Sequence, residues 1–256
     1  MIRRLRSLAV LAALGALAAC KPAAPAGNTA APFVAPSRAM TLTAKDGVTI
    51  YARLYPAEQP KALILLFHQA GSSKDEYATI APRLVAAGYS ALAIDQRAGG
   101  ALFGPNETAA HVAGKPTYRD AAPDLQAAID WARTQGPPVI VWGSSYSSSL
   151  VFPLAADNPA VKAVLAFSPG EYFDDPKFVA AAAARVSIPV FVTSAPDAEE
   201  VAAARAIADA VPRGLATRYV PVAGVHGAST LIPARDPKGA ETNWLPVLAF
   251  LKKVAP

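Results

Sequence analysis

Short runs of apolar residues, spaced along the chain, constrain the fold more than any other feature of the sequence. The run at residues 62–67 (ALILLF) shows no polar–apolar alternation, which is typical of a strand buried on both faces of a parallel sheet. Further strands are predicted at residues 90–94, 139–142, 161–167, 189–194 and 217–222. A sheet built from such strands must be covered on both faces by other elements.

Between these strands, apolar residues recur at the spacing of amphipathic helices. Helices are predicted from Tyr77 to Gly88, up to about residue 156, and at residues 118–134, 198–210 and 243–254. The domain opens with two strand-like segments, 40–45 and 48–55, joined through Asp46-Gly47, a strong hairpin turn signal. We therefore predict an α/β domain whose mainly parallel sheet is opened by an antiparallel hairpin, with helices on both faces.

The composition of the 256-residue chain, 53% hydrophobic and 17% charged, indicates a folded protein with a single core. The formal net charge is +5, but setting aside Arg3, Arg4 and Arg6 leaves 21 basic residues against 19 acidic ones, a net charge of +2. The remaining lysines and arginines form no run. Nucleic acid is therefore not expected as a partner, because its binding needs a concentrated basic face.

Residues 1–19 have the plan of a secretory signal peptide. The arginines at positions 3, 4 and 6 precede a stretch of apolar and small residues at positions 7–19. That stretch is shorter than the about 20 residues that a membrane-spanning helix needs. We therefore predict a cleaved signal and no transmembrane anchor.

The sequence Leu17-Ala18-Ala19-Cys20 resembles the lipobox of bacterial lipoproteins. The resemblance implies cleavage before Cys20 and lipidation of its thiol, which would tether the protein to a membrane of the bacterial cell envelope. Lys21 stands where an Asp retains lipoproteins at the inner membrane, which favours the outer membrane or periplasm. Residues 20–38, rich in Pro and Ala, predict a flexible tether before a globular domain at residues 39–256. The alternative is an ordinary signal peptide with an incidental cysteine.

The strand at residues 139–142 runs into Gly143-Ser144-Ser145-Tyr146-Ser147, which a predicted helix follows. This segment resembles the G-x-S-x-G nucleophile elbow of the α/β-hydrolases. In that family a small residue lies two positions to either side of the nucleophile, because strand and helix approach closely there. Only Ser145 has this spacing, from Gly143 and from Ser147, although Ser147 replaces the usual glycine. The alternative is a polar turn that caps a helix.

A nucleophilic serine needs a base and an acid that orients the base, and the family order is Ser, acid, His. His226 is the only histidine after Ser145, and it lies in a loop just after a predicted strand. The family places its acid after the strand that here covers residues 189–194, so Asp197 is our prediction and Glu199 the second choice. Asp197 is also suited to capping the following helix. Two earlier acids rank lower, Asp174 and Asp175.

The resemblance also implies an oxyanion hole made of two backbone N–H groups. The residue after the nucleophile, Tyr146, would supply one. The loop after the strand at 62–67 would supply the other, from Gln69 or Ala70, in a stretch where His68-Gln69 stands for the family's His-Gly. We expect His68 to order this loop by hydrogen bonding rather than to act as a base.

The resemblance is closest to small esterases and dienelactone-hydrolase-like members of the family. It implies hydrolysis of an ester or a related acyl bond of a small substrate through an acyl-enzyme. Residues 168–188 leave room for at most a small cap, and no motif for a cofactor or a metal is present. A thioester, lactone or peptide substrate on the same residues remains open, and so does a non-catalytic binding protein on a hydrolase scaffold.

Overall fold

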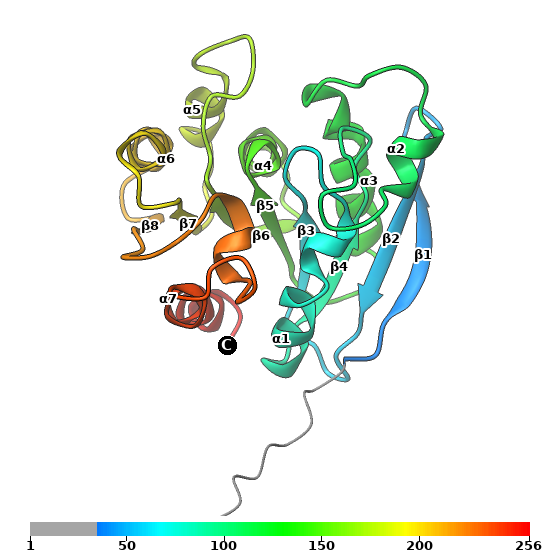
Figure 1. Ribbon diagram of the computed structural model, residues 1–256, viewed down its shortest axis with the longest axis horizontal. Helices are drawn as coiled ribbons and strands as arrows, with labels where there is room; N and C mark the ends of the chain where they lie inside the picture. Colours follow the sequence, from blue (N-terminus) through cyan, green and yellow to red (C-terminus); the bar gives the residue numbers. More distant parts are fainter. Residues whose placement is uncertain (1–34) are drawn as a thin grey trace, which may run out of the picture. The chain divides into compact units, whose positions relative to one another are not determined.

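An eight-stranded sheet forms the centre of the computed structural model, which describes residues 35–256 (Figure 1). Its strand order is β1-β2-β4-β3-β5-β6-β7-β8. The strands are β1 (Arg38–Thr43), β2 (Thr49–Tyr55), β3 (Leu63–Phe67), β4 (Ser90–Ile94), β5 (Val139–Ser144), β6 (Val161–Phe167), β7 (Val190–Thr193) and β8 (Ala216–Tyr219). From β4 to β8 neighbouring strands are parallel, whereas β1, β2 and β4 pair antiparallel. The predicted parallel sheet with an opening hairpin is confirmed.

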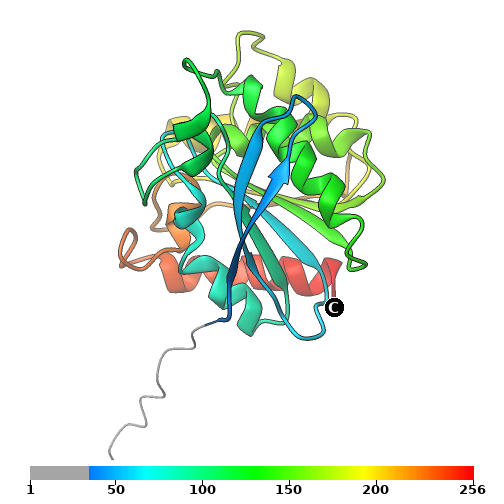
Figure 2. The ribbon, with the colours of Figure 1, turned by 90° about the vertical axis from the view of Figure 1, so that its right-hand side faces the viewer.

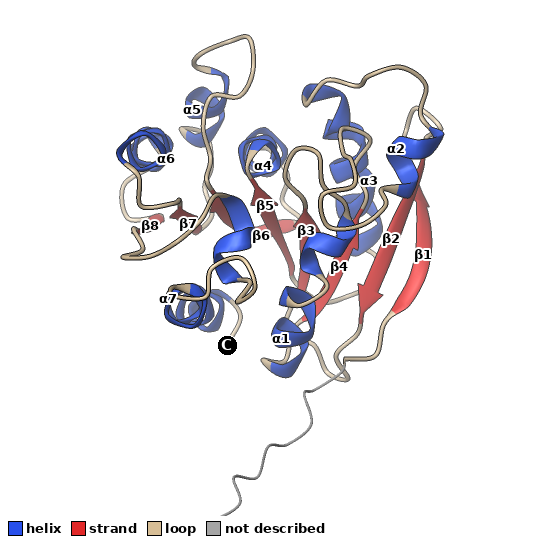
Figure 3. Cartoon of the chain, in the orientation of Figure 1, coloured by secondary structure: helices blue, strands red, loops and turns tan. Residues whose placement is uncertain are grey.

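Helices pack on both faces of this sheet (Figure 3). One face carries α3 (Ala122–Ala132), α4 (Tyr146–Ala156), α5 (Phe178–Ala183) and α6 (Ala198–Ala210), and the other carries α1 (Ile80–Ala86) and α7 (Ala240–Val254). A short helix, α2 (Glu107–His111), contacts β2. Three short 3-10 helices complete the set: η1 (Lys74–Tyr77), η2 (Arg119–Ala121) and η3 (Gly227–Leu231).

The central strands explain why the apolar runs lack alternation. Every residue of β3, β4 and β5 is buried, because side chains on both faces of the sheet meet helices. Leu65 and Leu66 are neighbours in β3, lie on opposite faces and are both fully buried. Burial of one such side chain contributes about 1.5–3 kcal/mol.

Prolines account for two differences between the predicted and the observed elements. The helix predicted at residues 118–134 begins as an α-helix only at Ala122, with Pro123 in its first turn, where the missing N–H costs nothing. The strand predicted at 217–222 ends at Tyr219, ahead of Pro221, which has no N–H to donate to a neighbouring strand.

The predicted signal peptide and Cys20 lie outside the described residues. The predicted tether ends too late, because Ala35 is buried in the core on the α1 and α7 face and Arg38 already belongs to β1. None of the helices within residues 35–256 combines the length and the apolar character needed to cross a bilayer.

The parallel strands all point their carboxyl ends to one edge of the twisted sheet (Figure 2). In open α/β sheets, ligands bind at that edge. The loops after β3, β5, β6, β7 and β8 are therefore where a functional site is expected.

Candidate active site

Ser145 lies on the sharp turn between β5 and α4, in a backbone conformation that side chains rarely adopt. Its φ is 59° and its ψ is −126°. Such a conformation costs of order 1–3 kcal/mol and persists only where the surroundings impose it. Here the Ser145 N–H donates to the carbonyl of Phe167 at the end of β6, at 2.8 Å. The strained turn holds the Ser145 hydroxyl at the carboxyl edge of the sheet.

The small residues around Ser145 have separate physical reasons. A Cβ added at Gly143 would lie 2.4 Å from the Cα of Ser148, so no larger residue fits there. The Ser147 Oγ lies 2.8 Å from the Phe67 carbonyl oxygen and 2.9 Å from the Ser144 carbonyl oxygen, and it accepts the Ser144 N–H at 2.9 Å. The departure from glycine at this position thus adds hydrogen bonds that close the turn and join it to β3.

His226 follows β8 and precedes η3, and it lies beside Ser145. The Ser145 hydroxyl lies 2.8 Å from Nε2 of His226, and Nδ1 lies 2.6 Å from Oε1 of Glu200. The tautomer that satisfies both contacts has Nδ1–H donating to the carboxylate and Nε2 accepting from the serine. The structure thus brings Ser145 and His226, the predicted nucleophile and base, together.

The predicted acid was wrong, because Asp197 does not contact His226. Asp197 is the N-cap of α6, and its Oδ1 accepts the backbone N–H of Glu200 at 3.0 Å. Glu199 is exposed, as are Asp174 and Asp175. Glu200, one helical position beyond the second choice, faces His226. Asp197 and Glu200 have the D-x-x-E spacing of a capping box, a sequence signal that places Asp197 at the cap and Glu200 at the third position.

A second serine, Ser168, holds Glu200 in place and has no counterpart among the sequence-based predictions. It follows β6 with a φ of 54°, donates to Oε2 of Glu200 at 2.7 Å and accepts the N–H of Gly227 at 2.9 Å. The N–H of Ala195 donates to the same carboxylate oxygen at 3.0 Å. Ser168 thus links the carboxylate to the loop that carries His226.

The electrostatics of the pair follow from these contacts. Burial opposes the ionisation of Glu200, but hydrogen bonds from His226, Ser168 and Ala195 outweigh it and lower the pKa of Glu200. The hydrogen bond to Glu200 raises the pKa of His226 above its usual 6.5, against the opposing effect of burial. An ionised carboxylate therefore lies beside an imidazole whose protonated form it favours.

The loop after β3 distinguishes between the two predicted oxyanion donors. The N–H of Gln69 donates to Oε2 of Glu76 at 2.9 Å. Within residues 35–256 no hydrogen bond is donated by the N–H of Ala70, and Tyr146 is the first residue of α4, whose N–H has no partner inside the helix. Ala70 and Tyr146 are therefore the free donors of the predicted set.

His68 orders the loop after β3, as expected. Its Nδ1 donates to the Gln69 carbonyl at 2.8 Å, and its Nε2 accepts the Gln96 N–H at 2.9 Å. Complete burial lowers the pKa of His68 to about 4, so the ring is neutral. Both ring nitrogens are engaged, and neither is available as a base.

A hollow of about 270 Å³ opens beside His226. Its lining is part apolar and part polar: Gln69, Leu102, Phe103, Val225, His226, Ser229 and Arg235. Near Ser145, Tyr172 is partly exposed and donates to the Ser168 carbonyl at 2.9 Å. Hollows of about 430 Å³ lie around Asp46 and Val112, with neither Ser145 nor His226 in their walls. Across residues 35–256, no cluster of His, Cys, Asp and Glu has the arrangement of a metal site.

Comparisons with known proteins agree with this fold. The family described as "Serine aminopeptidase, S33", a hydrolase family, matches residues 58–214. No curated protein matches the chain.

Among solved structures, an esterase of Pyrococcus furiosus is similar at 18% identity with a TM-score of 0.67, covering 87% of this chain and 94% of its own. A dienelactone hydrolase of Anabaena variabilis is similar at 18% identity with a TM-score of 0.66, covering 87% and 99%. A cold-adapted esterase from an Arctic intertidal metagenomic library is similar at 20% identity with a TM-score of 0.66, covering 90% and 99%. At such identities the likeness shows the fold.

Proposed function

We propose, from the premise that this chain belongs to the α/β-hydrolase family matched at residues 58–214, that it is a serine hydrolase cleaving an ester or related acyl bond of a small substrate. One observation carries the proposal. Ser145, His226 and Glu200 form an unbroken hydrogen-bonded series, with contacts of 2.8 Å and 2.6 Å. Nucleophile, base and orienting acid in this order are what acyl transfer through a covalent intermediate requires.

In the first half of the reaction, Ser145 Oγ attacks the carbonyl carbon of the substrate while its proton passes to Nε2 of His226. The negative charge that develops on the carbonyl oxygen is stabilised by the N–H groups of Tyr146 and Ala70. Glu200 stabilises the imidazolium that forms. His226 then donates the proton to the leaving group, the bond to that group breaks, and the acyl chain remains on Ser145.

In the second half, a water molecule takes the place of the leaving group. His226 accepts a proton from this water, which attacks the acyl-enzyme. Collapse of the second oxyanion intermediate returns the proton to Ser145 and releases the carboxylic acid. The hollow of about 270 Å³ beside His226 is at the small end for a ligand site and supports short acyl or alcohol groups.

A peptide substrate is the second candidate, and the description of the matched family favours it. The same three residues can cleave an amide. Aminoacyl p-nitroanilides and short p-nitrophenyl esters offered in parallel separate the two candidates, because an ester hydrolase turns over the esters alone.

The test of the proposal compares the wild type with Ser145→Ala and with the neighbouring Ser148→Ala, using a fluorophosphonate probe. We expect labelling of the wild type and of Ser148→Ala, and none of Ser145→Ala. Circular dichroism checks that each variant is folded. A folded wild type that the probe does not label would instead favour a binding protein on a hydrolase scaffold.

We also propose that Cys20 carries a lipid anchor that holds the domain at the cell envelope. The lipobox-like segment at residues 17–20 supports this. The test is incorporation of labelled palmitate in a bacterial host, with Cys20→Ala as the control. Equal incorporation in both, or none in either, contradicts the anchor.

A further inference from the structure

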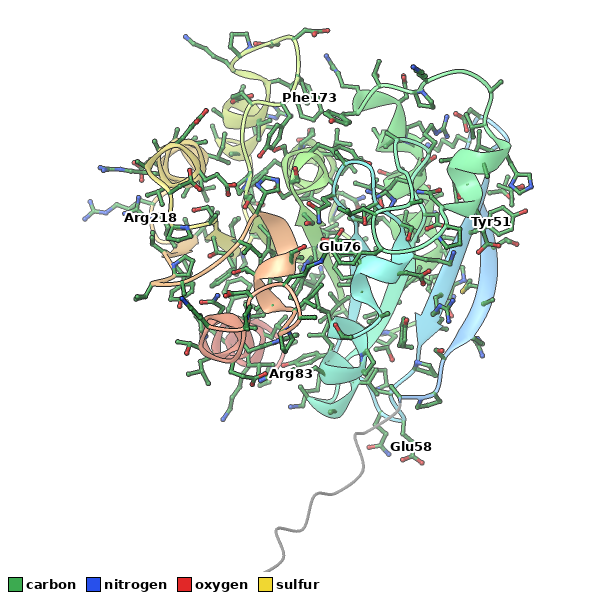
Figure 4. All side chains as sticks on the ribbon, viewed as in Figure 1. Tyr51, Glu58, Glu76, Arg83, Phe173 and Arg218 are labelled. Carbon is green, nitrogen blue, oxygen red and sulfur yellow. The ribbon has the colours of Figure 1, made fainter. Side chains whose placement is uncertain are left out.

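Glu76 is a buried acid that the proposed reaction does not use. It lies on η1, is 1% exposed and occupies the middle of the molecule in Figure 4. Within residues 35–256, no lysine or arginine forms an ion pair with it. On the same η1, Lys74 pairs with Asp95, and Asp75 with Arg53. Burying a carboxyl group without a cationic partner costs free energy, and hydrogen bonds to the carboxyl oxygens must offset that cost.

Those contacts join three loops of the candidate site. Oε2 of Glu76 accepts the N–H of Gln69 at 2.9 Å, in the loop after β3. Oε1 accepts the hydroxyl of Ser144 at 2.8 Å, the residue before the nucleophile. The Ser144 Oγ in turn accepts the N–H of Ala228 at 2.9 Å, two residues after His226. One carboxyl group thus ties together the loop after β3, the turn that carries Ser145 and the start of η3 beside His226.

The contact with Gln69 also decides which donor faces the substrate. With its N–H committed to Glu76, Gln69 cannot donate to an oxyanion, and Ala70 is left to do so. The Gln69 side chain adds a second link between the loop after β3 and η3, because its Nε2 donates to Ser229 Oγ at 3.1 Å.

The charge of Glu76 acts on His226 as well. The titratable groups that interact with Glu76 are His226 and two buried phenols, Tyr77 and Tyr146, whose pKa values burial raises well above 10. Burial raises the pKa of Glu76 itself to about 7, and hydrogen bonds from Gln69, Ser144 and Ser72 oppose that rise. Of these neighbours only the imidazole of His226 becomes positive, and the Glu76 charge favours that form.

We infer that Glu76 is a positioning residue of the hydrolytic site: it holds the Gln69 and Ala228 loops on the nucleophile turn and, when ionised, stabilises the imidazolium of His226. The inference rests on the proposed function. Neither role involves contact with the substrate. The two roles are separable, because one needs hydrogen bonds and the other needs charge.

The experiment measures the rate of fluorophosphonate labelling and the turnover of p-nitrophenyl acetate from pH 5 to 9. Glu76→Gln keeps the size and hydrogen-bonding capacity of the side chain but removes its charge. We expect the acidic midpoint of both profiles to fall by about 0.5 pH unit or more. Ser144→Ala keeps the carboxyl group but breaks the link to Ala228, so we expect kcat to fall about tenfold, with KM within about twofold and a smaller shift of the midpoint than in Glu76→Gln. Glu241→Gln, which removes an exposed carboxylate from α7, serves as the control.

A Glu76→Gln profile that superimposes on the wild type after scaling would overturn the charge role. An unchanged labelling rate in Ser144→Ala would overturn the link, and it does so even if Glu76→Gln fails to fold. A wild type that is never labelled contradicts the proposed function instead, so the two failures are distinguishable.

Discussion

Asp197 and Glu200 lie three residues apart at the start of one helix, yet only Glu200 faces His226. Asp197 turns back and accepts the N–H of Glu200 at 3.0 Å, whereas Oε1 of Glu200 lies 2.6 Å from Nδ1 of His226. The cap therefore fixes the backbone from which the acid projects. Two carboxylates at the start of the same helix therefore make different contacts.

Substitutions at these two positions should separate catalysis from stability. We expect Glu200→Gln to lower kcat by about 10³-fold or more, because the amide no longer stabilises the imidazolium or fixes its tautomer. Asp197→Ala should keep most of the activity and lose about 1 kcal/mol of unfolding free energy, as other lost N-caps do. Steady-state kinetics and urea denaturation measure both quantities. Equal losses of kcat in the two variants would contradict the assignment.

The pH dependence of the wild type follows from the His226–Glu200 contact. Only neutral His226 can accept the proton of Ser145, and Glu200 raises the pKa of His226 above 6.5. We therefore expect kcat/KM to rise with pH, with its midpoint above 6.5. Removing the largest cause of that shift in Glu200→Gln should move the midpoint to lower pH. The check is a kcat/KM profile with a substrate that does not itself titrate; an unmoved midpoint would show that another group controls the profile.

Restoring the glycine that is usual in related turns should weaken this protein. Ser147→Gly removes a hydroxyl that contacts Phe67 and Ser144, and it adds backbone freedom inside a helix. We expect a loss of about 2 kcal/mol in unfolding free energy, with the nucleophile still reactive. Thermal melts and fluorophosphonate labelling test the two parts. Ser147→Ala, which removes the hydroxyl but keeps the Cβ, is the matched comparison.

The buried Glu76 should make stability depend on pH independently of any activity. Its pKa is about 7 in the folded protein against 4.5 in a solvated chain, so the folded state holds the proton more tightly. The stabilisation is complete below about pH 4.5 and is lost as the pH rises through about 7, a difference on the order of 3 kcal/mol. Glu76→Gln should lack this loss. The measurement is urea denaturation of both proteins at several pH values, because the contributions of His226 and Glu200 to the unfolding free energy cancel in the comparison. Parallel curves of unfolding free energy against pH would refute the prediction.

The sheet could be predicted from the sequence because a strand buried on both faces is a continuous run of apolar residues, as at residues 62–67. Ser145 and His226 could be predicted because spacing and chain order leave few choices. Glu200 could not be chosen among the neighbouring acids from its place in the sequence alone. The acid that faces inward depends on which residue caps the helix, and here that residue is Asp197. The connections made by Ser168 and Glu76 were also missed. Each depends on contacts between loops that are distant in the chain, and a lone serine or glutamate carries no pattern of its own.

The Ser147 hydroxyl hydrogen-bonds to the Phe67 carbonyl and so couples the turn that carries Ser145 to the loop that carries Ala70. This hydrogen bond holds Ser145 in position relative to the Ala70 N–H, and the proposed reaction needs that arrangement before a substrate binds. The acid stands outside this unit, on α6 beyond β7. A substitution at Glu200 should therefore leave the position of Ser145 relative to the Ala70 N–H unchanged.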